Sequence, residues 1–289
     1  MTLQFASAPP ASIRLGLIGD NIKQSRSPDL HRIAGQLCGL EVQYDLLVPG
    51  ELGLSFDAVF DACRRDGVRG VNITYPYKEQ VVVRLASAST DVTRIGSANT
   101  VVFTPDGPVG YNTDYLGFMA AYRAHFGERP AGRVGIVGAG GVGRAIAFAL
   151  TALGASELRL FDADIGRAHR LAAALGEHAP RPHVGRDLAE VLDGVDGVVN
   201  CTPVGMVGNP GSAVPIELLG RKGWAFDAVY TPVETEFLRL AGRAGCNVLS
   251  GYELFFQQGI AAFKLFTGRM PPLDDLRRQL DPLQHREAS

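Results

Sequence analysis

Residues 134–162 constrain the fold more than any other stretch, because three spaced glycines there follow an apolar run and precede a helix-forming segment. The run ends at Val137, and Gly138, Gly140 and Gly143 follow with the spacing G-x-G-x-x-G. Glycines at this spacing permit a tight turn, a close approach of backbone N–H groups to a pyrophosphate, and close packing of a helix on a strand. The positive end of the helix dipole then faces the phosphates. The segment predicts a dinucleotide-binding βαβ unit.

An acidic residue at the end of the next apolar run supports this interpretation. Leu158–Phe161 is typical of a second strand, and Asp162 follows it about 20 residues beyond the glycines, where a carboxylate accepts hydrogen bonds from the ribose hydroxyls. We therefore expect the cofactor to be bound by the following residues: Gly138, Ala139, Gly140, Gly141, Val142, Gly143 and Asp162.

Length and charge limit the remaining possibilities. With 289 residues and 46% hydrophobic composition, the chain can form two cores. Its 28 basic and 30 acidic residues give a net charge of −2 without long like-charge runs, which favours a small-molecule substrate over nucleic acid or a membrane. A homodimer is compatible with the sequence, which does not determine the oligomeric state.

The cysteines and the N-terminus indicate a cytoplasmic protein. The four cysteines are scattered without a C-x-x-C pair, so we expect neither a metal site nor a disulfide framework. Residues 1–12 lack the basic and apolar regions of a signal peptide and are expected to form a terminal tail. No apolar stretch approaches the length of a membrane span.

Predicted strands and helices alternate along the chain, which predicts an α/β protein with two domains. Residues 1–115 are expected to form an α/β substrate-binding catalytic domain, and residues 116–252 a doubly wound Rossmann domain that binds NAD. The long apolar helix over 253–267 has no strand after it. We therefore expect residues 253–289 to return to the first domain and complete it.

Three polar motifs occur where strands of the first domain are predicted to end, which is where α/β sheets place their ligands. They are S-R-S-P at 25–28, N-I-T-Y-P-Y-K at 72–78 and N-T-D at 112–114. Each alone is explained by a helix start, a turn or a helix cap. Together they supply hydroxyls and amides for a polyol or a carboxylate, and Lys78 and Asp114 suit proton transfer during hydride transfer at a secondary alcohol.

With these motifs the chain resembles the shikimate/quinate dehydrogenase family over nearly its whole length. Further matching segments, in the family's order, are G-S-A-N-T at 96–100, N-T-D-Y-L-G-F at 112–118, G-A-G-G-V-G-R-A at 138–145, N-C-T-P-V-G-M at 200–206, D-A-V-Y-T-P-V-E-T at 227–235 and Q-G-I-A-A-F-K-L-F-T-G at 258–268.

The resemblance implies a role for individual residues. Ser25 and Ser27 would bind the substrate carboxylate, and Lys78 and Asp114 would flank the hydroxyl that is oxidised. The ring hydroxyls would be bound by Thr74, Asn99 and Gln258. The nicotinamide side would be lined by Asn200, Thr202 and Met206, with Gly251 where the C-terminal segment closes over the cofactor.

The cofactor preference follows from a departure within the family. NADP-using members often carry Asn-Arg-Thr/Ser after the second cofactor strand, whereas this chain has Asp162-Ala163-Asp164. Asp162 would repel the 2′-phosphate of NADP, so NAD is favoured. The departures Gln24 and Leu254–Gln257 leave the ring specificity open.

We therefore expect an NAD-dependent dehydrogenase acting on the C3 hydroxyl of shikimate or quinate, or on the corresponding ketone. One alternative is a family dehydrogenase for a related cyclic polyol acid such as aminoshikimate. Another is a non-catalytic NAD-binding sensor, which the Lys78 and Asp114 pair disfavours. The sequence does not decide whether Lys78 acts as a neutral base or as a cation that polarises the carbonyl.

Histidine is not expected to be catalytic here. His31 lies on an apolar-rich predicted helix and is interpreted as a packing or capping residue. The other histidines lie in polar segments where the sequence indicates no acidic partner: His125, His169, His178, His183 and His285.

Overall fold

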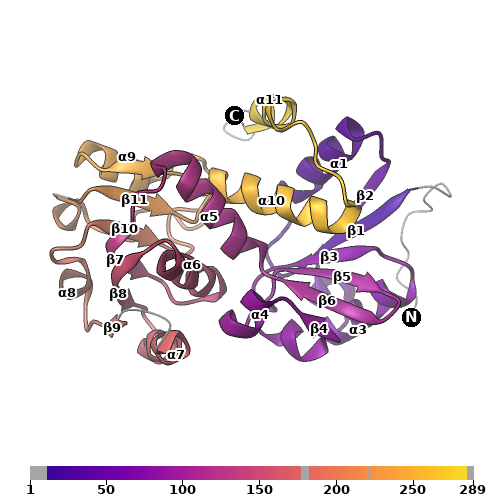
Figure 1. The fold of residues 1–289 in the computed structure, drawn as a ribbon, viewed down its shortest axis with the longest axis horizontal. Coiled ribbons are helices and arrows are strands. Elements are labelled where there is room, and N and C mark those ends of the chain that lie inside the picture. Colours follow the sequence, from indigo (N-terminus) through magenta and orange to yellow (C-terminus); the bar gives the residue numbers. More distant parts are fainter. Residues whose placement is uncertain (1–11, 177–181, 221, 285–289) are drawn as a thin grey trace. The chain divides into compact units, whose positions relative to one another are not determined.

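The computed structural model describes residues 12–176, 182–220 and 222–284, and its chain forms two compact units (Figure 1). Unit 1 consists of Met1–Thr113 and Gly259–Ser289, and unit 2 of Asp114–Gln258. The expected N-terminal tail falls almost entirely in residues 1–11, outside the described part of the chain.

Unit 1 is built on a mixed sheet whose strand order is β2-β1-β3-β5-β6-β4. β1 pairs in parallel with β2 and β3, whereas β5 is antiparallel to β3 and forms a hairpin with β6. The strands are β1 (Ile13–Ile18), β2 (Val42–Leu47), β3 (Gly70–Ile73), β4 (Ser87–Ala88), β5 (Thr100–Thr104) and β6 (Gly107–Tyr111). The carboxyl ends of β1 and β3 and the first residue of β5 therefore lie at one edge of the sheet.

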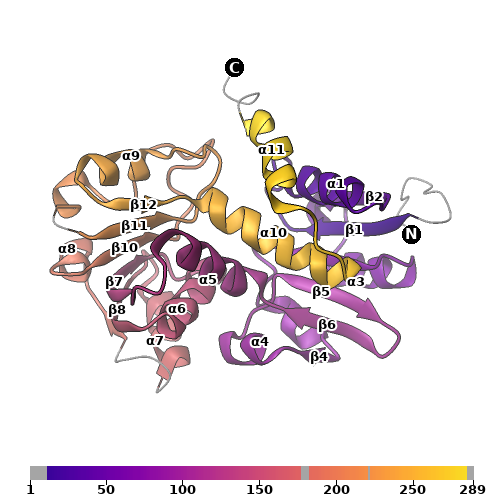
Figure 2. The same ribbon diagram turned by 45° about the horizontal axis from the view of Figure 1, so that its top comes forward.

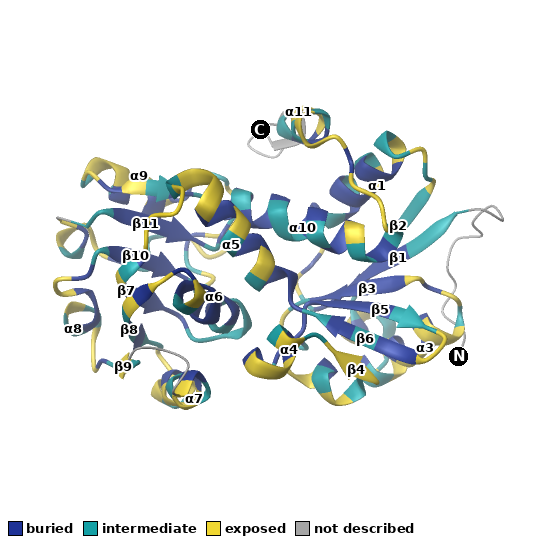
Figure 3. Ribbon diagram, in the orientation of Figure 1, coloured by how far each residue is buried: buried dark blue, intermediate teal, exposed yellow. Residues whose placement is uncertain are grey.

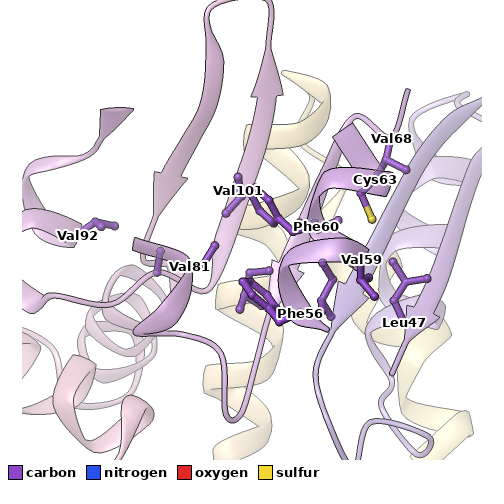
Figure 4. Packing of buried hydrophobic residues seen from close by; sticks show 13 residues of the cluster. Leu47, Phe56, Val59, Phe60, Cys63, Val68, Val81, Val92 and Val101 are labelled. Carbon is purple, nitrogen blue, oxygen red and sulfur yellow. The ribbon is translucent and has the colours of Figure 1, made fainter. Parts of the chain in front are cut away.

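One face of this sheet is covered by α3 (Phe56–Arg65), an amphipathic helix capped by the Ser55 side chain. Phe56, Val59, Phe60 and Cys63 from this helix pack against Val71 and Val101 of the strands (Figure 4). The shorter helices of this unit are α2 (Pro49–Leu52), η1 (Gln80–Arg84) and α4 (Thr90–Ile95).

The other face is covered by α1 (Ser27–Leu37) and by the C-terminal part of α10 (Gly251–Thr267). Gly259 of α10 lies so close to Leu30 that an added Cβ would come within 2.5 Å of it. α11 (Leu273–Gln284) packs beside α1 (Figure 2). α10 begins in unit 2, and its residues from Gly259 onward belong to unit 1.

Unit 2 contains six parallel strands in the order β12-β11-β10-β7-β8-β9. This is the doubly wound Rossmann order, with the switch point between β7 and β10, so the predicted fold class is confirmed. The central strands β7, β10 and β11 are largely buried (Figure 3). The strands are β7 (Gly132–Val137), β8 (Ala155–Phe161), β9 (His183–Val184), β10 (Gly197–Asn200), β11 (Trp224–Asp227) and β12 (Asn247–Leu249).

Helices cover both faces of this sheet. Trp224 and Phe226 of β11 pack on aromatic residues of α5, while Ala225 between them packs with residues of α9. This alternation follows from the two-residue period of a strand. The helices are α5 (Thr113–Phe126), α6 (Gly141–Ala152), α7 (Ile165–Leu175), α8 (Leu188–Leu192), η3 (Ile216–Leu218) and α9 (Glu236–Arg243).

Among the described residues, five elements of the structure are missing from the sequence prediction: α2, β4, β9, α8 and α11. β9 is a two-residue edge strand and α8 spans five residues, so neither presents enough periodic positions to be recognised. Among the helices that the structure describes, none combines the length and the apolar character needed to cross a membrane.

Candidate functional site

The polar motifs of unit 1 meet at the edge where β1 and β3 end. An added Cβ on Gly19, just after β1, would come within 2.2 Å of Thr74, so the two loops are in contact. The backbone N–H of Ile73 donates to the carbonyl of Asn99 at 2.8 Å, and that of Ala98 donates to the carbonyl of Lys78 at 2.9 Å. The sheet thereby brings Thr74, Lys78 and Asn99 to one place.

Ser25 and Ser27 flank the start of α1, which has Pro28 in its first turn. The Ser25 hydroxyl lies 3.2 Å from that of Ser27 and accepts a hydrogen bond from the Ser27 backbone N–H at 3.3 Å. Between them, Arg26 is buried and donates to the carbonyl of Leu280 on α11 at 3.0 Å. α11 thus anchors the loop that carries the two serines.

Lys78 and Asp114 are both buried, with 8% and 6% of their surface exposed. Lys78 belongs to unit 1, while Asp114 is the first residue of unit 2 and lies in the first turn of α5. Gln258, the last residue of unit 2, donates to the Phe255 carbonyl at 3.1 Å within α10. Asp114 and Gln258 therefore stand at the two crossings of the chain between the units.

The glycine loop of unit 2 has the geometry that its sequence predicts. Gly138 has φ +99° and packs against the Cys201–Thr202 backbone, and an added Cβ on Gly143 would come within 2.1 Å of the Gly138 carbonyl. At Gly140, the N-cap of α6, an added Cβ would meet nothing within 4 Å. The loop therefore leaves open space beside the first N–H groups of α6, which fits a bound pyrophosphate.

Asp162 ties the glycine loop to the loop after β8. Its carboxylate accepts from the backbone N–H of Ala139 at 2.7 Å and from that of Asp164 at 2.8 Å. Each oxygen retains acceptor capacity for a ribose hydroxyl. Asp164 instead caps α7 and lies within 4 Å of Arg167 and Arg170, so two cations offset its charge.

The side chain of Asn200, which is predicted to line the nicotinamide side, is fully engaged within the protein. Its Nδ2 donates to the Val204 carbonyl and to Asp227, and its Oδ1 accepts from the N–H and the hydroxyl of Thr202. An Asn side chain has two donors and two acceptor positions, so none is left for a ligand. Asn200 shapes the loop that presents Thr202 and the exposed Met206.

Sequence reasoning did not single out Asp227, a fully buried carboxylate at the end of β11. It accepts from Asn200 at 2.9 Å, from the Val229 N–H at 3.0 Å and from the Thr235 hydroxyl at 2.5 Å. Burial raises its pKa to about 6, although all three hydrogen bonds lower it. An acid directly after an apolar strand in D-A-V-Y is the signal that could have revealed it.

Gly251 begins α10 against the backbone that follows β11. An added Cβ would come within 2.4 Å of the Val229 carbonyl and 2.7 Å of the Asp227 carbonyl, so only glycine fits. Tyr230, from the same loop, stacks on Phe255 of α10 at a ring separation of 4.8 Å. These contacts fix the start of α10 beside the carboxyl end of the sheet.

The structure also explains the environments of Cys201 and His31. Burial, followed by the charges of Asp227 and Asp114, raises the pKa of the Cys201 thiol well above its ordinary value, which makes it a poor nucleophile. His31 is a packing residue, stacked on Tyr44 at 4.7 Å, and burial lowers its pKa to about 3.

One histidine expectation was wrong: His183 does have an acidic partner, since its Nε2 lies 3.0 Å from Glu190 on α8. The sequence hides this pair because it depends on how the chain turns between β9 and α8. His178 and His285 lie outside the described residues. Within residues 12–176, 182–220 and 222–284, no group of three or more His, Cys, Asp or Glu side chains is placed to hold a metal ion.

Comparison with known proteins gives consistent matches at both ends of the chain. Residues 17–101 match the model of the shikimate dehydrogenase substrate binding domain, and residues 251–280 match that of the shikimate 5′-dehydrogenase C-terminal domain. The quinate/shikimate dehydrogenase (NAD(+)) of Corynebacterium efficiens is 38% identical over 274 residues, which are 92% of this chain and 96% of that protein.

Two further relatives bear on the cofactor. The shikimate dehydrogenase (NADP(+)) of Streptomyces avermitilis is 39% identical over 280 residues, covering 93% of this chain and 94% of that protein. Quinate dehydrogenase from Corynebacterium glutamicum in complex with NAD superposes with a TM-score of 0.86 at 35% identity, covering 94% of this chain and 99% of that one. By sequence and by structure, this chain belongs to the shikimate/quinate dehydrogenase family of oxidoreductases.

Proposed function

We propose that this protein is an NAD-dependent dehydrogenase that oxidises the C3 hydroxyl of shikimate and quinate and catalyses the reverse reduction. The observation that carries the proposal is the presence, in one chain, of two complementary polar edges. Unit 1 offers hydroxyls, an amide and a buried lysine where β1 and β3 end. Unit 2 offers an open glycine loop and Asp162 where β7 and β8 end.

NAD is proposed as the cofactor because Asp162 stands where the ribose of the adenosine would lie. Its carboxylate is held by two backbone N–H groups, so it cannot swing away from a 2′-phosphate without breaking them. Repulsion of NADP would then rest on Asp162, since Arg167 and Arg170 offset the charge of Asp164. The related NADP enzymes make this preference a point to be tested.

Separate groups of side chains would bind the substrate and transfer the proton. When bound, the nicotinamide ring exchanges a hydride with the carbon that carries the reacting oxygen. Ser25 and Ser27 would bind the ring carboxylate, and Thr74, Asn99 and Gln258 the other polar groups of the ring. Lys78, with Asp114 as its partner, would take the hydroxyl proton during oxidation and return it during reduction. Burial of both keeps competing water away.

The test is a comparison of kcat/KM for shikimate and quinate, each with NAD and with NADP. We expect oxidation of both acids, with higher values for NAD. A higher value with NADP would refute the cofactor assignment. Activity on neither acid would refute the proposed function and favour aminoshikimate as substrate or the sensor. Turnover of aminoshikimate with NAD would then distinguish the two, because a sensor binds NAD without turning over a substrate.

A further inference from the structure

The orientation of the Asn99 side chain in unit 1 is fixed by groups that can only donate or only accept. Its Oδ1 lies 2.6 Å from the backbone nitrogen of Thr113, the first residue of α5. A backbone N–H only donates, so the side-chain atom facing it is the amide oxygen. Among the described residues, Asn99 Nδ2 has no hydrogen-bond partner. It is also absent from the set of fully buried polar atoms without a partner, so Nδ2 is accessible to solvent.

A buried chain of hydrogen bonds supports this orientation from behind. The Thr100 and Thr113 hydroxyls lie 3.2 and 3.1 Å from Asn99 Oδ1. Asn72 Nδ2 donates to Thr100 at 3.0 Å and to the Asn99 carbonyl at 3.3 Å, and the Tyr44 hydroxyl donates to Asn72 Oδ1 at 2.8 Å. Because the Asn99 carbonyl only accepts, Asn72 cannot be reversed. The Thr100 and Thr113 hydroxyls also lie 3.0 Å from each other, where either can donate.

From this arrangement we infer that Asn99 presents only N–H groups to the ring, and that it thereby selects a hydroxyl over an amine at the ring position it contacts. The inference rests on the proposed function, which places the ring against Asn99. A hydroxyl oxygen accepts from Nδ2 and keeps its own proton for another partner. An alkyl amine is an ammonium at neutral pH, has no lone pair, and would leave two donors facing each other.

Thr100 is a positioning residue in this scheme. Its side chain is fully buried, so it cannot touch a ligand directly, and its hydroxyl contacts the Asn99 oxygen. Its hydroxyl accepts from Asn72, and its own proton faces both the Asn99 oxygen at 3.2 Å and the Thr113 hydroxyl at 3.0 Å. Loss of the Thr100 hydroxyl weakens the positioning of the Asn99 side-chain amide, while every group proposed to contact the substrate is still present.

The experiment compares shikimate with its two analogues in which a non-reacting ring hydroxyl is replaced by an amine. For each acid, both kcat/KM and binding to the protein by calorimetry are measured. We expect the wild type to favour shikimate by at least about 100-fold over the analogue whose amine lies against Asn99. The other analogue serves as an internal control, because its amine lies elsewhere.

The decisive variant is Asn99→Asp. It keeps an acceptor for the Thr113 N–H, and the negative charge at the start of α5 is favourable, so the fold is retained. It replaces the outward donor with an acceptor. The preference for hydroxyl over amine should fall by at least about 100-fold for one analogue and stay unchanged for the other, with NAD affinity unaltered.

A second pair of variants tests the positioning role. Thr100→Val should raise the KM for shikimate about 5-fold with little change in kcat, and Thr100→Ser should restore it, because serine regains the hydroxyl. If Asn99→Asp turns over shikimate but changes neither preference, or if Val and Ser at position 100 behave alike, the inference is overturned. Absence of both turnover and binding with wild-type protein would instead overturn the proposed function, and the inference with it.

Discussion

The buried Asp227 gives a prediction about how stability depends on pH. Its pKa is raised from the ordinary 3.8 to about 6 by burial. A carboxyl whose pKa is higher in the folded state binds more protons there, so stability is greatest at low pH and is lost as pH rises through about 6. Above that pH, the charged Asp227 costs about 3 kcal/mol relative to the unfolded chain.

The variant Asp227→Asn removes this dependence. An amide can still accept from Asn200 and Val229, but the Thr235 hydroxyl loses its acceptor, a fixed cost of about 1 kcal/mol. Only the wild type titrates at this position. Its stability relative to the variant should therefore fall by about 1.4 kcal/mol between about pH 5 and about pH 8, in addition to any constant offset.

The measurement is urea unfolding followed by the fluorescence of Trp224, the only tryptophan of the chain. Trp224 is fully buried between aromatic residues of unit 2, so it reports on the unit that contains Asp227. Asp106→Asn, an exposed turn residue of unit 1, is the matched control and should show no such change. A difference between wild type and Asp227→Asn that is the same at both pH values would refute the reasoning.

Three further predictions concern catalysis and specificity. Lys78→Ala should lower kcat by about 10²- to 10⁴-fold while the Kd for NAD stays near wild type, and near-normal turnover would show that Lys78 does not transfer the proton. Asp162→Asn combined with Ala163→Arg should raise the ratio of kcat/KM for NADP over NAD, because a repulsive charge is removed and a hydrogen-bond donor to phosphate is added at an exposed position. Asp162→Asn alone is the control for disturbance of the glycine loop. An unchanged ratio in the double variant would contradict the assignment of NAD as cofactor. Ser27→Ala should lower kcat/KM for both acids. The decrease should be larger for quinate if its additional hydroxyl binds the same side chain, since an unpaired buried hydroxyl costs roughly 1–3 kcal/mol. Equal kcat/KM values for wild type and variant would show that Ser27 does not bind the substrate.

The sequence by itself determined the Rossmann fold of unit 2. The spacing of Gly138, Gly140 and Gly143 after an apolar strand leaves few alternatives, because each glycine answers a local steric demand. The sequence also placed the polar motifs of unit 1 at strand ends, since apolar runs locate strands and the residues that follow them share an edge of the sheet. These features depend on neighbours close in the chain.

Only the tertiary structure decided what the individual polar side chains do. All hydrogen-bonding positions of the Asn200 side chain are occupied by Thr202, Val204 and Asp227. The orientation of the Asn99 side chain is set by its hydrogen bond to Thr113, a residue 14 positions away. A hydrogen bond depends on the direction and identity of the facing group, and that group comes from another strand or helix. For this reason a motif can name a polar residue near a ligand, while the fold determines whether it binds the ligand or positions its neighbour.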